Sequence, residues 1–355
     1  MKIKELQTIL KEKKIDLFLA VSIDFEKPDP DCTYFAQYKS VGVLAVPNNK
    51  KPMLVVPQME AKGAQHKSIK VKYPKEKKPL LKFLAQELKK QNIRPKKIAI
   101  NNTEVTLQLK AILKKTFKAT FVDISSEVSK LRTTKTKEEI AIIKQGYKIS
   151  DAIFQKGIKQ FTRGKTETDI AAFFQYEAKK RGCDLAFPVI IASGKRAAEV
   201  HHFPINKRLL KGFCVIDFGI KYKNYCTDTT RTIFLGSPTK KELQTYNRVL
   251  EAQKNAVGAC KAKAKAADIV SQVNKDLGDH AELFTHGLGH GFGIKIHEQP
   301  NLKPDSKDVL KENMFVTIEP GIYKEFGIRI EDGVHITKNG HEILSKFPKK
   351  LITIR

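Results

Sequence analysis

The sequence contains no run of apolar residues long enough to form a transmembrane helix, which would need about 18 to 20 of them. The N-terminal stretch MKIKELQTILKEKKIDLFLA has no uninterrupted apolar block, because its charged residues alternate with apolar ones at helical spacing. It is therefore not expected to be a secretory signal. The five cysteines form no CxxC pair and are odd in number, which indicates reduced, buried thiols. We expect a cytoplasmic protein without a membrane segment.

Acidic residues are scarce relative to basic ones: 38 Asp and Glu stand against 66 Lys and Arg, so the formal net charge is +28. The excess is mostly lysine and is spread over both parts of the chain. The sequence lacks an RGG run, a basic strip interleaved with aromatics and a Cys/His finger, which would accompany many nucleic-acid-binding surfaces. We interpret the charge as a solvated lysine-rich surface and expect no nucleic-acid partner; a functional contact with a polyanion is the alternative.

A length of 355 residues favours two domains. Up to about residue 130, apolar strand patterns such as IDLFLAV, VGVLAVP and KIAIN alternate with helical patterns such as PLLKFLAQELKKQ, and no phosphate-binding loop is present. This pattern predicts an α/β domain over residues 1–130 and a second domain over 131–355.

Two amphipathic helices are predicted at the start of the second domain. One follows LRTTKTKEEI, where Thr136 and Glu139 have the spacing of a capping box, and the other covers ETDIAAFFQYEAKKRG and ends at Gly182. Strands and turns follow from about residue 187. A further helix is predicted over about 239–265, with its KAKAKAA run as a solvated lysine face.

Two pairs of acids share one design. Asp217 and Asp228 flank the polar turn of VIDFGIKYKNYCTDTTRT, and Glu319 and Glu331 flank the turn of VTIEPGIYKEFGIRIED. Each pair is predicted to lie on the facing strands of a β-hairpin. Buried acids placed side by side raise each other's pKa and are costly unless a positive charge compensates them.

A histidine-rich segment, THGLGHGFGIKIHEQP, lies between the two hairpins and contains His286, His290 and His297. Four acids and one imidazole that converge would form a cage for two divalent cations. Taken singly, each acid could be a turn or cap residue and each histidine a structural one. The glycines of GLGHGFG do not have the spacing of a nucleotide-binding G-x-G-x-x-G loop.

These motifs resemble the pita-bread metallopeptidases, the family of methionine aminopeptidase, aminopeptidase P and prolidase. DTTRT, GLGHGFG followed by HEQP, IEPGIY and RIEDGV are similar to the family's motifs from about residue 130 to the end. Residues 1–130 resemble the creatinase-type N-terminal domain of aminopeptidase P and prolidase. The resemblance implies an α/β domain followed by an α+β pita-bread domain, in which an antiparallel sheet is flanked by helices with pseudo-two-fold symmetry.

The resemblance also implies the roles of individual residues. The metal ligands would be Asp217, Asp228, His290, Glu319 and Glu331, which would hold two divalent ions. An oxygen-rich shell with one imidazole suits Mn²⁺ best, with Co²⁺ or Zn²⁺ as alternatives. A hydroxide bridging the ions would be the nucleophile and Glu319 the general base.

Further residues near the ligands follow from the same resemblance. The substrate-side histidines would be His201, His286 and His297, of which His297 would hydrogen-bond the developing oxyanion. The neighbouring His202 is expected to be a surface residue. Thr230 and Arg329 would orient the carboxylates.

The implied function is an Xaa-Pro aminopeptidase, which would act on peptides with proline at the second position. The alternatives are an Xaa-Pro dipeptidase (prolidase) and, less favoured because all five ligand positions are intact, a non-catalytic binding protein. The resemblance implies a homodimer.

Overall fold

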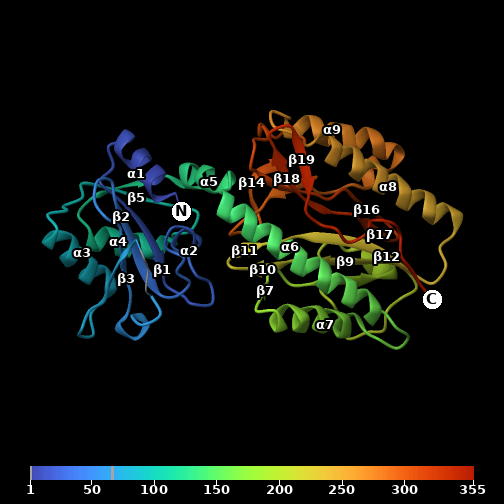
Figure 1. Ribbon diagram of the computed structural model, residues 1–355, viewed down its shortest axis with the longest axis horizontal. Helices are drawn as coiled ribbons and strands as arrows, with labels where there is room; N and C mark the ends of the chain where they lie inside the picture. The colour runs from blue at the N-terminus through green and yellow to red at the C-terminus, as the bar shows by residue number, and fades with distance from the viewer. Residues whose placement is uncertain (1, 65–67) are drawn as a thin grey trace. The chain divides into compact units, whose positions relative to one another are not determined.

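The computed structural model describes residues 2–64 and 68–355 and divides into two compact units, Met1–Leu131 and Arg132–Arg355 (Figure 1). No helix among the described residues is long and apolar enough to cross a membrane. Each unit is described here by itself.

The first unit is built on one mixed sheet with the strand order β4-β3-β2-β1-β5-β6. Its central strand pairs antiparallel with β2 and parallel with β5. The strands are β1 (Leu17–Ser22), β2 (Gly42–Pro47), β3 (Met53–Val55), β4 (Lys70–Lys72), β5 (Lys97–Ile100) and β6 (Thr120–Asp123). The helices are α1 (Ile3–Glu12), α2 (Pro30–Ala36), α3 (Leu80–Lys90), α4 (Leu107–Thr116) and α5 (Ser125–Thr133), the last of which runs past the end of the unit.

Both faces of this sheet are covered, which explains why its central strands are apolar throughout. In β1 the side chains of Leu17, Leu19 and Val21 pack into a core formed with α3 and α4. The intervening Phe18 points the other way, where its ring meets the ring of Phe35 on α2 edge to face at 6.0 Å. A strand buried on both sides reads as a continuous hydrophobic run rather than an alternating one.

The second unit repeats one layout: a pair of helices followed by an antiparallel strand pair and a small two-stranded excursion. In its first half, α6 (Lys137–Gly157) and α7 (Glu167–Lys180) precede a sheet of order β20-β12-β9-β8. The strands are β8 (Ile190–Ser193), β9 (Gly212–Phe218), β12 (Thr229–Leu235) and β20 (Thr353–Ile354). Between β9 and β12 the chain forms β10 (Ile220–Tyr222) and β11 (Tyr225–Cys226), and β10 also pairs with β7 (Asp184–Leu185).

The second half has the same order of elements. The helices α8 (Lys240–Ala259) and α9 (Ala266–Leu277) precede a sheet of order β14-β13-β15-β18-β19. Its strands are β13 (Gly289–Gly291), β14 (Glu298–Leu302), β15 (Phe315–Ile318), β18 (Asp332–Thr337) and β19 (Gly340–Ile343), and the excursion is β16 (Gly321–Tyr323) with β17 (Gly327–Arg329). In Figure 1, α7 and the pair α8–α9 lie on opposite sides of the strands of this unit.

The local predictions for the helices of the second unit had mixed outcomes. The capping box at α6 is present, because the Thr136 hydroxyl accepts from the Glu139 amide and the Glu139 carboxylate accepts from the Thr136 amide. The helix predicted over about 239–265 is present, but its predicted end was wrong. Helix α8 ends at Ala259, and the first five residues of the KAKAKAA run form a turn, with Lys263 at φ 73°, before α9 begins at Ala266.

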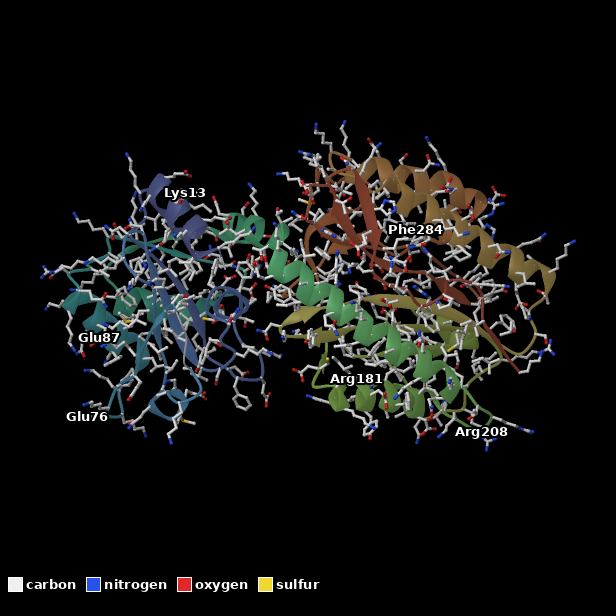
Figure 2. All side chains as sticks on the ribbon, viewed as in Figure 1. Lys13, Glu76, Glu87, Arg181, Arg208 and Phe284 are labelled. Atoms are coloured by element: carbon white, nitrogen blue, oxygen red, sulfur yellow. The ribbon has the colours of Figure 1, made fainter. Side chains whose placement is uncertain are left out.

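The lysine-rich surface agrees with its sequence interpretation in the described residues. Lys11, Lys13 and Lys14 at the end of α1 are all exposed. Figure 2 shows nitrogen-tipped side chains that project outward from the helices of each unit. Charged lysine side chains in contact with solvent cost little folding free energy.

Candidate metal centre

The first pair of acids lies at one end of the β9–β12 strand pair. Asp217 is the penultimate residue of β9 and faces Thr230 on β12, while Asp228 comes directly before β12. The chain between them turns through Lys223 and Asn224, which have φ angles of 46° and 77°. Two consecutive left-handed residues form the tight turn that suits a twisted hairpin. The turn thus returns the chain so that both carboxylates come from adjacent strands.

The second pair of acids occupies the corresponding place on the β15–β18 strand pair. Glu319 directly follows β15 and Glu331 directly precedes β18, and the adjoining residues Ile318 and Asp332 are paired across the two strands. The small β16–β17 hairpin separates the two acids, as β10–β11 separates the first pair. Both hairpins predicted from the acid spacings are therefore present, with the acids at the strand ends.

His290 comes from β13, a short strand enclosed by β14 and β15. The glycines on either side of it explain how this strand fits. A Cβ atom on Gly289 would collide with the backbone carbonyl of Thr317, and one on Gly291 with that of Gln299. The two glycines that flank His290 thus allow the backbone of β13 to lie very close to the backbones of β14 and β15.

The side chains from these strands meet at one place. Ligand atoms of Asp228, His290 and Glu331 all lie within 4.8 Å of one another. The Nε2 atom of His290 is 3.6 Å from the Oδ2 atom of Asp228 and 3.5 Å from the Oε1 atom of Glu319. These spacings are too long for strong hydrogen bonds and leave room for an ion between the atoms.

The electrostatics of the cluster are those of acids that repel one another. Burial, followed by the charge of Glu331, raises the pKa of Asp228 well above its usual range. Burial and the charge of Glu319 do the same to the pKa of Glu331. Burial raises the pKa of Glu319 to about 7, although the charge of Arg329 opposes the rise. Burial lowers the pKa of His290 to about 4, so its imidazole is neutral at pH 7 and free to coordinate a cation.

Two carboxylate oxygens in this cluster are available to coordinate a cation. Among the described residues, the Oδ1 atom of Asp217 and the Oε1 atom of Glu331 are buried without a hydrogen-bond partner. A buried carboxylate oxygen without a partner is costly unless a cation coordinates it. The donor set of oxygens with one imidazole nitrogen suits hard to borderline divalent ions. The residues present therefore fit divalent cations.

The other oxygens of the same carboxylates are held by the protein. The Nη2 atom of Arg329 donates to the Oδ2 atom of Asp217 at 2.7 Å, and its Nε atom donates to the Thr230 hydroxyl at 3.2 Å. That hydroxyl in turn donates to the Oε2 atom of Glu331 at 2.7 Å. Arg329 and Thr230 thus lie where the resemblance implied, in contact with one candidate ligand from each hairpin.

The cluster forms the floor of a cavity of about 380 Å³, a volume that suits a small molecule. All five candidate ligands line it, as do the predicted substrate-side histidines His201, His286 and His297. Burial, with the charge of Arg329 next, lowers the pKa of His286 to about 4, and burial with the charge of His201 lowers the pKa of His297. The rings of His290 and His297 meet edge to face at 4.3 Å. The structure thus brings the five candidate ligands, the three histidines and Arg329 to one cavity, whereas Thr230 is not among its lining residues.

The expectation for His202 was wrong. It is buried rather than exposed, and its ring lies between the carboxylates of Glu167 and Glu199. His201 is the exposed member of the pair. The backbone turns between the two residues, so that adjacent histidines have opposite surroundings.

Three residues at the site were not predicted from the sequence. The Thr317 hydroxyl donates to Glu319 Oε1 at 3.2 Å and accepts from the backbone amide of His290 at 3.0 Å. The Tyr323 hydroxyl lies 3.0 Å from both His286 Nε2 and Arg329 Nη1. The buried Tyr147 hydroxyl donates to the backbone carbonyl of Asp228 at 3.0 Å. Only Thr317 had a signal, because it lies two residues before Glu319 on a strand and thus on the same face.

Two families of known proteins match the sequence. Residues 141–338 match metallopeptidase family M24, and residues 2–134 match the creatinase/prolidase N-terminal domain. Among curated proteins, the chain is 44% identical over 239 residues to the Xaa-Pro dipeptidase of Pyrococcus furiosus, a match that covers 65% of this chain and 68% of the relative. It is 40% identical over 238 residues to the Xaa-Pro dipeptidase of Pyrococcus horikoshii, with the same coverage.

Solved structures of a prolidase and of an X-Pro aminopeptidase are similar to the chain. The prolidase of Pyrococcus horikoshii has a TM-score of 0.89 at 33% identity, over 99% of both chains. An X-Pro aminopeptidase from Thermotoga maritima has a TM-score of 0.89 at 32% identity, over 96% of this chain and 98% of that one.

Proposed function

Because the chain belongs to metallopeptidase family M24 and is therefore a peptidase, we propose that it is an Xaa-Pro dipeptidase, which hydrolyses the bond before the proline of a dipeptide. The fold class and the family resemblance inferred from the motifs are confirmed by the same matches. The observation that carries the proposal is that all five candidate metal ligands line one cavity.

The choice of dipeptidase over aminopeptidase differs from the main sequence expectation. The sequence favoured an Xaa-Pro aminopeptidase and kept the dipeptidase as its alternative. Curated relatives at 44% and 40% identity are named Xaa-Pro dipeptidases, which supports the alternative better. The aminopeptidase is the second candidate, because a structure of that name is similar over nearly the whole chain.

Asp217, Asp228, His290, Glu319 and Glu331 would hold two divalent cations, for which we propose Mn²⁺. When bound, such cations neutralise the carboxylates, polarise a substrate carbonyl and lower the pKa of water. Arg329 and Thr230 fix the second oxygens of Asp217 and Glu331, so these carboxylates are oriented before any cation arrives.

The chain's own residues would move the protons of the reaction. Glu319, whose pKa burial raises to about 7, is suited to accept a proton from the attacking water and to return it to the prolyl nitrogen. That nitrogen belongs to a tertiary amide and must be protonated to leave. His297 would donate a hydrogen bond to the oxygen that becomes negative during attack, and Thr317 would keep Glu319 oriented.

The wall of the cavity supports an apolar ring in the substrate. The apolar lining residues are Phe187, Pro188, Ile190, Val200 and Ile296. A proline ring has no backbone N–H to satisfy and can be buried against such a surface at little cost. We propose that this wall receives the proline.

Three further expectations stay predictions. A homodimer is implied by the family resemblance, and a cytoplasmic location is expected from the unpaired cysteines and the N-terminal sequence. We also expect no nucleic-acid partner, because the positive charge lacks the motifs that accompany such binding.

The experiment compares two substrates with the Mn²⁺-loaded protein. We expect Ala-Pro to be hydrolysed and Ala-Pro-Ala to be cleaved at least about 10-fold more slowly, because binding energy in a dipeptidase depends on the free carboxylate next to the proline. Release of proline or Pro-Ala is measured by chromatography, with metal content determined on the same samples. Faster cleavage of Ala-Pro-Ala would refute the dipeptidase and favour the aminopeptidase.

A further inference from the structure

His201 lies on a segment that has no regular structure of its own. After the short 3₁₀ helix at Gly194–Ala198, residues 199–207 form neither helix nor strand. Such a segment has no ladder of backbone hydrogen bonds; single backbone hydrogen bonds, such as that from the Thr168 amide to the Ile205 carbonyl, and side-chain contacts together determine its path. The position of the exposed His201 ring in the cavity therefore depends on its neighbours.

The main anchor of this segment is Glu167, in the first turn of α7. Its side chain is fully buried and accepts hydrogen bonds at both oxygens. At Oε1 it accepts from the Ser193 amide at 2.9 Å, the Ser193 hydroxyl at 2.8 Å and the Arg196 Nε atom at 2.8 Å. At Oε2 it faces the Nε2 atom of His202 at 2.8 Å. One carboxylate thus joins α7, the end of β8 and the segment that carries His201.

His202 lies between two carboxylates. Its Nε2 atom faces Glu167, and its Nδ1 atom is 2.7 Å from the Oε2 atom of Glu199. A carboxylate only accepts hydrogen bonds, so each contact needs a proton on the ring nitrogen that faces it, and the contact to Glu167 needs the Nε2–H. The two contacts hold the ring in one orientation inside the protein, and the preceding residue, His201, is exposed.

The residues on either side of this contact are also held. The Nη1 atom of Arg329 donates to the backbone carbonyl of Val200 at 3.1 Å, and the same guanidinium binds Asp217. Further along, the amide of Ile205 donates to Glu167 Oε2 at 3.4 Å. The residues on both sides of His201 are therefore fixed: Val200 by its backbone contact to Arg329, which binds Asp217, and His202 by its side-chain contact to Glu167 of α7.

We propose that the Glu167–His202 pair positions His201 in the substrate cavity. Glu167 does not line the cavity, so it acts through its neighbours and not on the substrate. Five donors at Glu167 hold the segment against the start of α7, and the two contacts of the buried His202 ring fix the backbone next to His201. The effect of this pair on hydrolysis rests on the proposed function, whereas its effect on the position of His201 is a claim about the structure alone.

Two replacements of His202 separate this role from simple packing. The amide nitrogen of glutamine can take the place of Nε2, whereas that of asparagine takes the place of Nδ1 and does not reach Glu167. We expect His202→Asn to lower kcat on the order of 10²-fold, because small misplacements of a reacting group have effects of that size. We expect His202→Gln to retain activity within about 10-fold, because it keeps the donation to Glu167.

A matched control comes from the same helix. Glu177 is also a buried glutamate of α7, and it binds Arg181 and Lys156 instead of the 199–207 segment. Glu177→Gln removes the same charge as Glu167→Gln and should leave kcat within about 2-fold, whereas Glu167→Gln should lower kcat as His202→Asn does. Equal losses in both variants would mean that the effect comes from destabilising α7, and would overturn the proposal.

The kinetic test is completed in a His201→Ala background. If His202 acts through His201, His202→Asn should add less than about 2-fold to the loss already caused by His201→Ala. Multiplicative losses would overturn the proposal.

Crystal structures test the positional claim separately. His201 should shift or lose density in His202→Asn and stay in place in Glu177→Gln. An inactive wild-type protein would refute the proposed function but not this positional claim. An unmoved His201 in His202→Asn would overturn the positional claim.

Discussion

The carboxylate of Asp228 shows how strongly this site depends on a compensating positive charge. Its pKa is raised well above the usual range by burial and then by neighbouring acids, Glu331 foremost. Asparagine has nearly the same shape but no charge, so it should not coordinate a cation well. We expect Asp228→Asn to reduce Mn²⁺ content and to lower activity by more than about 10²-fold.

The measurement is metal content by mass spectrometry, together with turnover, after reconstitution with Mn²⁺. Asp305→Asn, at an exposed residue, makes the same chemical change away from the cavity and should behave as the wild type. Full metal content and normal turnover in Asp228→Asn would contradict the assigned role.

The residues of the cluster could be predicted from the sequence because each lies at a fixed place on a hairpin or a glycine-framed strand. Asp217 and Asp228 were identified from their spacing across a polar turn, and the structure has them on adjacent strands. The surroundings of His202 could not be predicted. It lies on an irregular segment without periodicity, and its partner Glu167 is 35 positions away in the sequence. Contacts of this kind depend on tertiary packing, which no local pattern encodes.

At the scale of elements, the narrow space around β13 explains why glycines flank His290. We expect Gly289→Ala to lower the free energy of unfolding by about 1–3 kcal/mol, because the new methyl group must displace the β15 backbone at Thr317. Thermal unfolding measured by circular dichroism checks this. Gly340→Ala is the control, because nothing lies within 4 Å of a Cβ atom at that strand residue. Equal stability of the two variants would contradict the argument.

Element boundaries were predictable where the local signals were strong. Thr136 and Glu139 marked the start of α6 through their capping spacing. The KAKAKAA run was misread because lysine and alanine both favour helices. In the structure this segment pairs with residues 308–310: the amide of Lys263 donates to the carbonyl of Leu310, and the amide of Leu310 donates to that of Ala264. Those distant hydrogen bonds outweigh local propensity.

At the scale of the whole molecule, the stability of the metal-free protein should depend on pH above about 6.5. Burial raises the pKa of Glu319 from 4.5 to about 7, so the folded protein keeps a proton that the unfolded chain has released. Raising the pH removes this proton and destabilises the folded state. His290, whose pKa burial lowers to about 4, contributes in the opposite direction, but only below about pH 6.5, where the unfolded histidine becomes protonated.

We therefore expect the free energy of unfolding of chelator-treated protein to fall by about 1 kcal/mol or more between about pH 6.5 and pH 8.5, because Glu319 loses its remaining proton there and the raised pKa values of Asp228 and Glu331 act in the same direction. Mn²⁺ should remove most of this fall, because a cation takes the place of the proton among the acids. Urea denaturation at both pH values, with and without Mn²⁺, measures it. A metal-free protein that becomes more stable over this range would contradict the electrostatic account of the cluster.

The repeated layout of the second unit divides the coordinating side chains between two successive stretches of chain. Asp217 and Asp228 belong to the stretch before residue 236, and His290, Glu319 and Glu331 to the stretch after residue 239. With these residues as the ligands, neither stretch alone would contain the complete set. Cation release and loosening of the contact between the two stretches would then be coupled, and a backbone break at 236–239 would leave two fragments that could coordinate two ions only by reassociating.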